Sequence, residues 1–249
     1  MRRRSIALML IMLLASMAGA ACFKEKNMAI PDYTKDYTSP DERILIKSIM
    51  SGDLEALRQL AASRVNMNAL GKADNTPMRV ALKCRQATVV TFLLQQGVDP
   101  NFVTPTGAVP AFVAAEQDDL QILTMLLDRG LNPNIKEDGE PIIFAAIRES
   151  QWANVRLLVS RGADVNGRTS YNSTVLLELI GMSQYDLAKA LITRGVDATI
   201  ENAAGLTVAR VLVNDQKAFG ADRNNANYKK RVELLELLKS RGVSVPAGY

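Results

Sequence analysis

The chain has 249 residues, of which 48% are hydrophobic and only 5% aromatic. It contains 30 Lys and Arg against 26 Asp and Glu, and no histidine. Without histidine there is no usual general base for a hydrolytic triad, and the commonest metal ligand is missing. The two cysteines, Cys22 and Cys84, lie too far apart in the sequence to suggest a zinc site. The sequence contains no cluster of basic residues that would suggest nucleic-acid binding.

Sequence motifs for catalysis are also missing. The chain contains no Walker-type phosphate loop, no paired-glycine nucleotide fingerprint and no GxSxG nucleophile elbow. Carboxylate pairs such as Asp118-Asp119 fall where a turn meets a helix, which favours a capping or solvated role. We therefore expect no enzymatic activity, no cofactor and no metal.

The first 21 residues have the pattern of a secretory signal peptide. Arg2, Arg3 and Arg4 precede an apolar run, residues 6–17, and small residues follow at 18–21. The run is shorter than the roughly 20 residues that a membrane-spanning helix needs. Removing the three arginines leaves 27 Lys and Arg against 26 Asp and Glu, so the mature protein is close to neutral.

Cys22 directly follows these small residues, which resembles the lipobox of bacterial lipoproteins. The resemblance implies that Cys22 is acylated and becomes the mature N-terminus. Phe23, rather than Asp, follows the cysteine, and in that family this directs the protein to the periplasmic side of the outer membrane.

Two alternatives to acylation remain open. Gly19 stands where the lipobox usually has Leu, and cleavage by an ordinary signal peptidase would leave a soluble product beginning at Ala21. A disulfide between Cys22 and Cys84 would also suit an oxidising compartment.

Residues 22–39 are expected to form a flexible tether, because they are polar and lack helical periodicity. As a coil, the 17 residues after Cys22 would span roughly 20–25 Å. Met28 in this segment is either an ordinary tether residue, the interpretation that we favour, or an alternative translation start that would give a cytosolic form with every repeat intact. Ser39, Pro40 and Glu42 then form a capping box that begins the folded domain, residues 40–249.

A short signature recurs five times in this domain. Its copies read RVNMN at 64–68, GVDPN at 97–101, GLNPN at 130–134, GADVN at 162–166 and GVDAT at 195–199. The steps between them are 33, 33, 32 and 33 residues. A period near 33 residues is typical of a stacked repeat protein.

The repeats resemble ankyrin repeats, whose pattern includes TPLHxA in the first helix. Thr76-Pro-Met-Arg-Val-Ala81 matches this pattern most closely, and Arg79 replaces the family's histidine. The resemblance covers residues 40–249 and implies an all-α, monomeric solenoid of about six helix-turn-helix repeats. An Asn-rich insertion at 216–227 is expected to be a surface loop, either tolerated or in contact with a partner.

Ankyrin proteins bind through turn tips and the exposed side of the first helices. Matching those positions gives a protein-binding surface of Lys72, Asn75, Lys83, Thr106, Glu116, Gln117, Glu137, Asp138, Arg148, Ser170, Tyr171, Met182, Asn214 and Asp215. Tyr171 falls at a turn tip, where packing does not explain an aromatic residue. Trp152 falls at a position that packs between helices, so we expect it to be structural.

The functional expectation is a periplasmic protein-binding module. Some bacterial ankyrin lipoproteins resemble immunity proteins that inhibit secreted, envelope-attacking lipases, and a lipid anchor plus a tether would suit that role. The alternative is an envelope scaffold or stress-protection factor that supports a resident enzyme. A neighbouring gene for a secreted lipase would favour the first function, and a neighbouring catalase or envelope-biogenesis gene the second.

Overall fold

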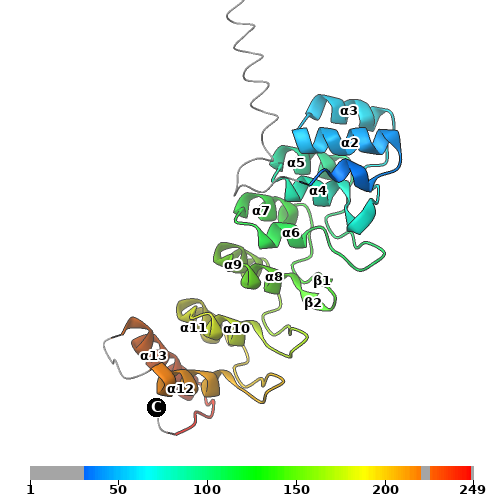
Figure 1. Cartoon of the computed structure of the whole chain (residues 1–249). Coiled ribbons are helices and arrows are strands. Elements are labelled where there is room, and N and C mark those ends of the chain that lie inside the picture. The colour runs from blue at the N-terminus through cyan, green and yellow to red at the C-terminus, as the bar shows by residue number, and fades with distance from the viewer. Residues whose placement is uncertain (1–30, 220–224, 248–249) are drawn as a thin grey trace, which may run out of the picture. The chain divides into compact units, whose positions relative to one another are not determined.

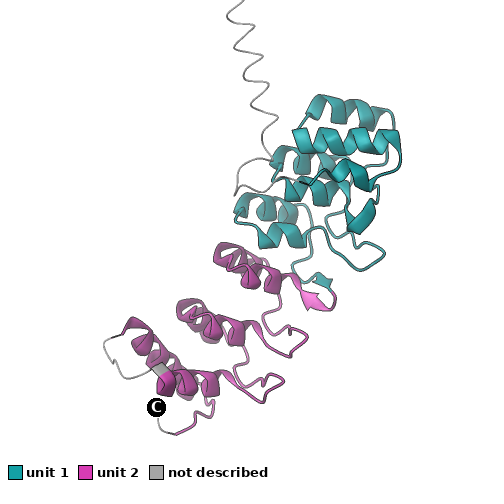
Figure 2. Cartoon of the chain, viewed as in Figure 1, with its two compact units in different colours: residues 1–137 teal, residues 138–249 magenta. Residues whose placement is uncertain are grey.

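The computed structural model describes residues 31–219 and 225–247. The predicted signal peptide at 1–21, Cys22 and Met28 lie outside the described residues. The chain divides into two compact units, residues 1–137 and residues 138–249 (Figure 2). Three α-helix pairs are described in each unit, so the predicted all-α architecture of about six helix-turn-helix repeats is confirmed for the described residues.

In the first unit, the first helices of successive pairs pack on one another, α2 on α4 and α4 on α6 (Figure 1). The second helices α5 and α7 pack in the same way. The elements are η1 (Tyr33–Asp36), α2 (Pro40–Ser51), α3 (Leu54–Ala62), η2 (Lys72–Asp74), α4 (Pro77–Lys83), α5 (Ala87–Gln95), α6 (Phe112–Glu116), α7 (Leu120–Asp128) and β1 (Lys136–Glu137).

The second unit repeats this arrangement. Helix α10 packs against both α8 and α12, and α11 packs against α13. The elements are β2 (Glu140–Pro141), α8 (Ile142–Arg148), α9 (Trp152–Ser160), α10 (Val175–Gly181), α11 (Tyr185–Thr193), α12 (Val208–Phe219) and α13 (Ala226–Ser240).

Local sequence signals explain where these helices begin and end. The hydroxyls of Thr76 and Thr174 accept hydrogen bonds from backbone amides in the first turns of α4 and α10. Gly97 follows α5 with φ +83°, a left-handed conformation that glycine adopts without strain. Arg64 occupies the corresponding place after α3 and adopts φ 60°, so the repeat geometry is kept although the residue has a Cβ atom.

The core of each unit lies between the helix pairs. In the first unit the fully buried side chains include Leu45, Leu93 and Leu123, which come from three successive repeats. Ile143 and Leu158 are fully buried in the second unit. Because these residues recur with the repeat, each helix pair buries its apolar face against its neighbours rather than within itself.

The structure differs from the predicted tether at its C-terminal end. Residues 33–36 form the 3₁₀ helix η1, and Tyr37 is only 2% exposed. The Tyr37 hydroxyl donates a hydrogen bond of 2.5 Å to the carbonyl oxygen of Asn75. A Cβ atom on Gly71 would lie 2.8 Å from the Tyr37 ring, so the glycine makes room for the aromatic side chain. Residues 32–39 are therefore part of the folded unit.

The predicted surface loop at 216–227 is also wrong at both ends. Helix α12 continues to Phe219 and α13 begins at Ala226. Gln216 is 5% exposed, and its Oε1 atom accepts a 2.8 Å hydrogen bond from Nε of Arg231, which is equally buried. The Asn-rich composition of the segment did not indicate this contact. Residues 220–224 lie outside the described part of the chain.

The pH dependence of stability tests the burial of Tyr37. Burial raises the pKa of Tyr37 far above the usual value of 10.0, and the charges of Asp36 and Glu42 raise it further. Above pH 10 the unfolded chain therefore loses this proton while the folded chain keeps it. The free energy of unfolding should fall as pH rises above about 10, by up to ~1.4 kcal/mol per pH unit from this one group.

The Tyr37→Phe variant is the matched control, because it keeps the ring and removes the hydroxyl. At pH 7 it should lose about 0.5–1.5 kcal/mol with the hydrogen bond to Asn75. Above pH 10 its stability should fall less steeply than that of the wild type. Urea unfolding of both proteins between pH 7 and pH 11.5 measures the two slopes, and equal slopes would contradict the burial of the phenol.

Candidate partner-binding surface

The fourteen predicted partner-binding residues divide into three groups by exposure. Asn75 is buried. The half-buried ones are Lys83, Glu116, Gln117, Glu137 and Asp215, and the exposed ones are Lys72, Thr106, Asp138, Arg148, Ser170, Tyr171, Met182 and Asn214. The repeat register thus predicts mainly accessible positions, and the contacts of each side chain decide which of them can meet a partner.

Asn75 is the clearest departure from the prediction. It is 4% exposed, and its Nδ2 atom donates a 2.7 Å hydrogen bond to Asp36 of η1. Its Oδ1 atom accepts a 2.9 Å hydrogen bond from the ammonium group of Lys83. Because both ends of the amide bind within the unit, Asn75 holds the N-terminal segment in place and is not a surface contact while that segment is bound.

Lys83 lies at the end of α4 between this amide and an aromatic ring. Its Nζ atom is 5.2 Å from the centroid of the Tyr33 ring, within range of a cation–π interaction. Burial lowers the pKa of Lys83, and the positive charge of Arg79 lowers it further, whereas Asp36 and Glu116 act in the opposite direction. The repeat pattern does not predict a role for Tyr33, Asp36 or Tyr37. The two tyrosine rings in a polar stretch were the available signal.

Three other predicted contacts in the first unit connect neighbouring repeats. Thr106 donates to the carboxylate of Asp74 at 2.5 Å, and a carboxylate oxygen of Glu137 accepts from the backbone amide of Val109 at 2.7 Å. Gln117 donates its side-chain amide to the backbone carbonyl of Leu82 at 2.9 Å. These side chains link neighbouring repeats of the unit.

Tyr171 is 78% exposed at a turn tip of the second unit. Its backbone is held firmly, because the carbonyl oxygen of Tyr171 accepts a 3.1 Å hydrogen bond from the amide of Ala203 in the next turn. Asn172 donates its side-chain amide to the carbonyl of Glu201 at 3.0 Å and accepts from Arg168 at 2.7 Å. The turn is therefore ordered while the ring faces solvent, the arrangement expected of an interface anchor.

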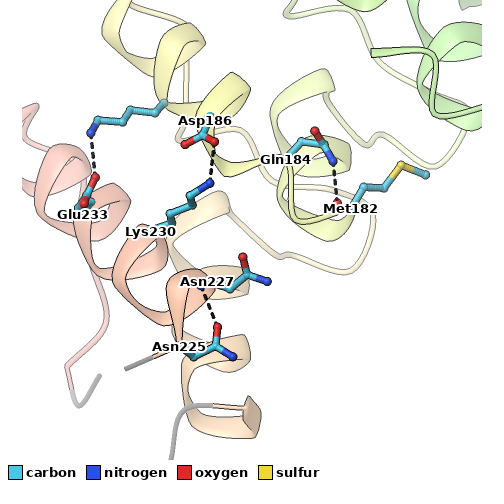
Figure 3. Close-up of polar contacts among 8 residues, drawn as sticks. Met182, Gln184, Asp186, Asn225, Asn227, Lys230 and Glu233 are labelled. Atoms are coloured by element: carbon cyan, nitrogen blue, oxygen red, sulfur yellow. Dashed lines mark hydrogen bonds and ion pairs between the residues drawn. The ribbon is translucent and has the colours of Figure 1, made fainter. Parts of the chain in front are cut away.

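Met182 and Asn214 add exposed side chains on the first-helix side of the same unit. Met182 follows the last residue of α10 and is 38% exposed, and its carbonyl oxygen faces the side-chain amide of Gln184 at 3.5 Å (Figure 3). Asn214 is exposed on α12, and the adjacent Asp215 is half-buried. Burial raises the pKa of Asp215, and the positive charge of Arg231 partly offsets this rise.

Two ion pairs connect the second helices α11 and α13 of this unit. Lys230 of α13 lies 2.6 Å from Asp186 of α11, and Lys189 of α11 lies 2.8 Å from Glu233 of α13 (Figure 3). All four side chains are substantially exposed, so each pair contributes little to stability, typically below about 1 kcal/mol. The pairs nevertheless orient α13 on α11.

Trp152 is half-buried at the first residue of α9. It is neither fully enclosed nor displayed to solvent, which fits the expected packing role better than that of a binding anchor.

No catalytic or metal-binding constellation is found in the described residues. No group of three His, Cys, Asp or Glu side chains within 31–219 and 225–247 could hold a metal ion. Nor does that part of the chain contain a helix with the length and apolar character needed to cross a bilayer. A groove of about 500 Å³ between α3 and α5 is lined by Leu54, Arg58, Thr88, Thr91, Phe92, Gln95 and Gln96, without a carboxylate or a nucleophile beside a base.

Comparison with known proteins agrees with the helix pairs. Residues 111–202 match the family model of ankyrin repeats in 3 copies. This segment is similar to ankyrin repeats. Ankyrin repeats are typically protein-interaction modules without catalytic activity, and they bind through an extended surface that the stack presents.

Similar proteins share these repeats over part of their length. The chain is 28% identical over 96 residues to the putative ankyrin repeat protein FPV242 of fowlpox virus, covering 39% of this chain and 26% of that protein. It is 32% identical over 85 residues to BRCA1-associated RING domain protein 1 of Caenorhabditis elegans, covering 34% and 12%. It is 34% identical over 61 residues to the putative ankyrin repeat protein FPV230 of fowlpox virus, covering 24% and 32%. The matches span a third or less of these relatives.

The exposure of Tyr171 leads to a stability prediction. Because the ring lies mostly in solvent, Tyr171→Ala should change the free energy of unfolding by no more than about 0.5 kcal/mol. Asn172→Ala should cost about 1–2 kcal/mol, since it removes two hydrogen bonds and leaves a Cβ-bearing residue at φ 60° without the help of an Asn side chain. Chemical denaturation of both variants measures the difference. A large loss in Tyr171→Ala would mean that the ring packs within the protein.

Proposed function

We propose that this protein is a periplasmic immunity protein that binds and inhibits a secreted, envelope-attacking toxin of the lipase type. The repeats support a protein-binding role, and Tyr171 carries the proposal in the structure, because it is a large aromatic side chain in solvent on an ordered turn. Two hydrogen bonds connect this turn to the next one, and a third within it joins Arg168 to Asn172. A signal-like leader with a lipobox-like cysteine supports the compartment.

Inhibition by such a surface requires binding alone and no catalytic step. A turn that is already ordered loses little conformational entropy when it binds, so contact area converts into affinity more efficiently. Tyrosine supplies a rigid, amphipathic contact, and buried tyrosines are among the side chains that dominate interface energies. Covering the toxin's active site or its lipid-docking surface would be sufficient for protection.

The proposed membrane anchor depends on the state of the cysteines. Cys84 is 1% exposed and disulfide-bonded, and the chain's other cysteine, Cys22, lies outside the described residues. An acyl-bearing thioether and a disulfide use the same sulfur atom of Cys22, so the two states exclude each other. Anchoring through Cys22 therefore requires acylation before oxidation.

The intact mass of the mature protein distinguishes these states. We expect a chain that begins at Cys22 and carries acyl groups. Cleavage before Ala21 together with a mass lower by two hydrogens would instead indicate a soluble, disulfide-bonded protein, and the anchor would be wrong. A Cys22→Ser variant is the control, because it prevents both modifications and should be released from membranes in either case.

Capture of the partner tests the binding role separately from the anchor. The mature chain should retain one secreted lipase-type toxin from secretion-competent cultures and abolish its activity on mixing. Tyr171→Ala should weaken this binding by about tenfold or more, as expected for an interface tyrosine. Arg156→Ala, at an exposed position of the second helix α9, should leave it unchanged. Recovery of resident envelope proteins alone would contradict the immunity role and favour an envelope scaffold.

A further inference from the structure

A short N-terminal segment, Asp32–Tyr37, lies across the first two repeats; we call it the strap. It contacts α2, and through hydrogen bonds it reaches the turn before α4 (Figure 1). The strap thus occupies a part of the first-helix side where the repeat register predicts partner contacts, namely Asn75 and Lys83.

The base of the strap is fixed. Tyr37 is fully enclosed, and its hydroxyl binds the carbonyl of Asn75. The carbonyl oxygen of Tyr37 accepts a 2.9 Å hydrogen bond from Nε of Arg43 in α2. Releasing Tyr37 would leave a cavity beside Gly71 and a carbonyl without its donor, so this end of the strap stays in place.

The outer part of the strap is held only by partly solvated contacts. Tyr33 and Asp36 are both half-buried. Asp36 accepts from the side-chain amide of Asn75, and the Tyr33 ring lies over the ammonium group of Lys83. Water can replace both interactions at modest cost, and this part can therefore open while Tyr37 remains bound.

The strap leaves one donor of the surface unused. The Nε atom of Arg79 is buried and has no hydrogen-bond partner. Arg79 lies close enough to Tyr33 and Lys83 to influence the pKa of both. A buried donor without an acceptor is costly, so a segment that brought a carboxylate to Arg79 would fit this surface better than the strap does.

We propose that Asn75, Lys83 and Arg79 form a binding site for an aromatic–acidic segment of the partner protein, and that Tyr33 and Asp36 of the strap occupy this site in its absence. The strap shows the chemistry that the site accepts: a ring over the ammonium group and a carboxylate at the amide, three residues apart on one turn of 3₁₀ helix. The inference rests on the proposed protein-binding role, but it requires neither the lipid anchor nor a particular toxin.

A peptide of residues 31–38, PDYTKDYT, is a probe that can be used before the partner is known. In the mature chain, Tyr33→Ala/Asp36→Ala should open the strap and leave Tyr37 in place. The matched control is Lys35→Ala/Thr38→Ala, which changes two exposed residues of the same stretch and keeps Asp32, the N-cap of η1. Titration of the peptide, followed by NMR of the Asn75 side-chain amide, measures binding to each protein.

We expect the open variant to bind the peptide saturably and at least tenfold more tightly than the wild type or the control, because in both of these the attached strap competes at a high effective concentration. A peptide with alanine in place of the residues corresponding to Tyr33 and Asp36 should not bind. The proposal would be wrong if the open variant folds but does not bind the peptide. It would also be wrong if all three proteins bind the peptide equally.

Hydrogen exchange of the wild type keeps the proposal testable if the open variant does not fold. The amide of Lys35 should exchange much faster than amides within α4, since the outer strap opens without unfolding the repeat. Equal protection would show that the strap is a permanent part of the core and would overturn the proposal. Neither measurement involves the toxin, so their failure is distinguishable from a failed capture experiment.

Discussion

The structure depends on the inability of any one repeat to bury its own apolar face. Helices such as α4 and α5 have seven and nine residues, too few to be stable alone in water. Their stability comes from side chains such as Leu82 and Leu93, which are fully buried among neighbouring helices. The helices must therefore repeat the same apolar positions, whereas the turns between them are free of that demand. Binding residues can vary in the turns without disturbing the core.

The turns are nevertheless rigid, and the recurring Asp and Asn residues explain why. In the first unit, Asp99 accepts the amide of Asn101 at 2.8 Å and thereby closes the turn. The Asn101 side chain then donates to the carbonyl of Gly130 and accepts from the amide of Asn132, both in the following repeat. Two signature residues thus divide these roles: Asp99 orders the turn, and Asn101 links it to the following repeat. The polar part of the signature serves recognition indirectly, by holding the tips that a partner would meet.

The sequence predicts what the repeat itself determines. The spacing of the signatures gave six helix pairs, and the register correctly placed Tyr171 and Met182 in solvent. The register could not predict the burial of Asn75, because that depends on residues 32–37, which belong to no repeat and are too few for a periodic pattern. The contact between Gln216 and Arg231 was hidden for the same reason, since an insertion has no counterpart in the other repeats from which its packing could be inferred.

The N-terminal strap shows how one segment can both stabilise a stack and take part in recognition. A first repeat lacks a neighbour on one side, and the stack gains stability if another part of the chain packs on it. A segment bound tightly along its whole length would do this well, but it would also hide Lys83 and Asn75 permanently. In this protein the stabilising contact is concentrated in one enclosed residue, Tyr37, and the solvated contacts lie in Tyr33 and Asp36. Stability and access to the surface are therefore assigned to different residues, and a partner can displace the second group without loss of the first.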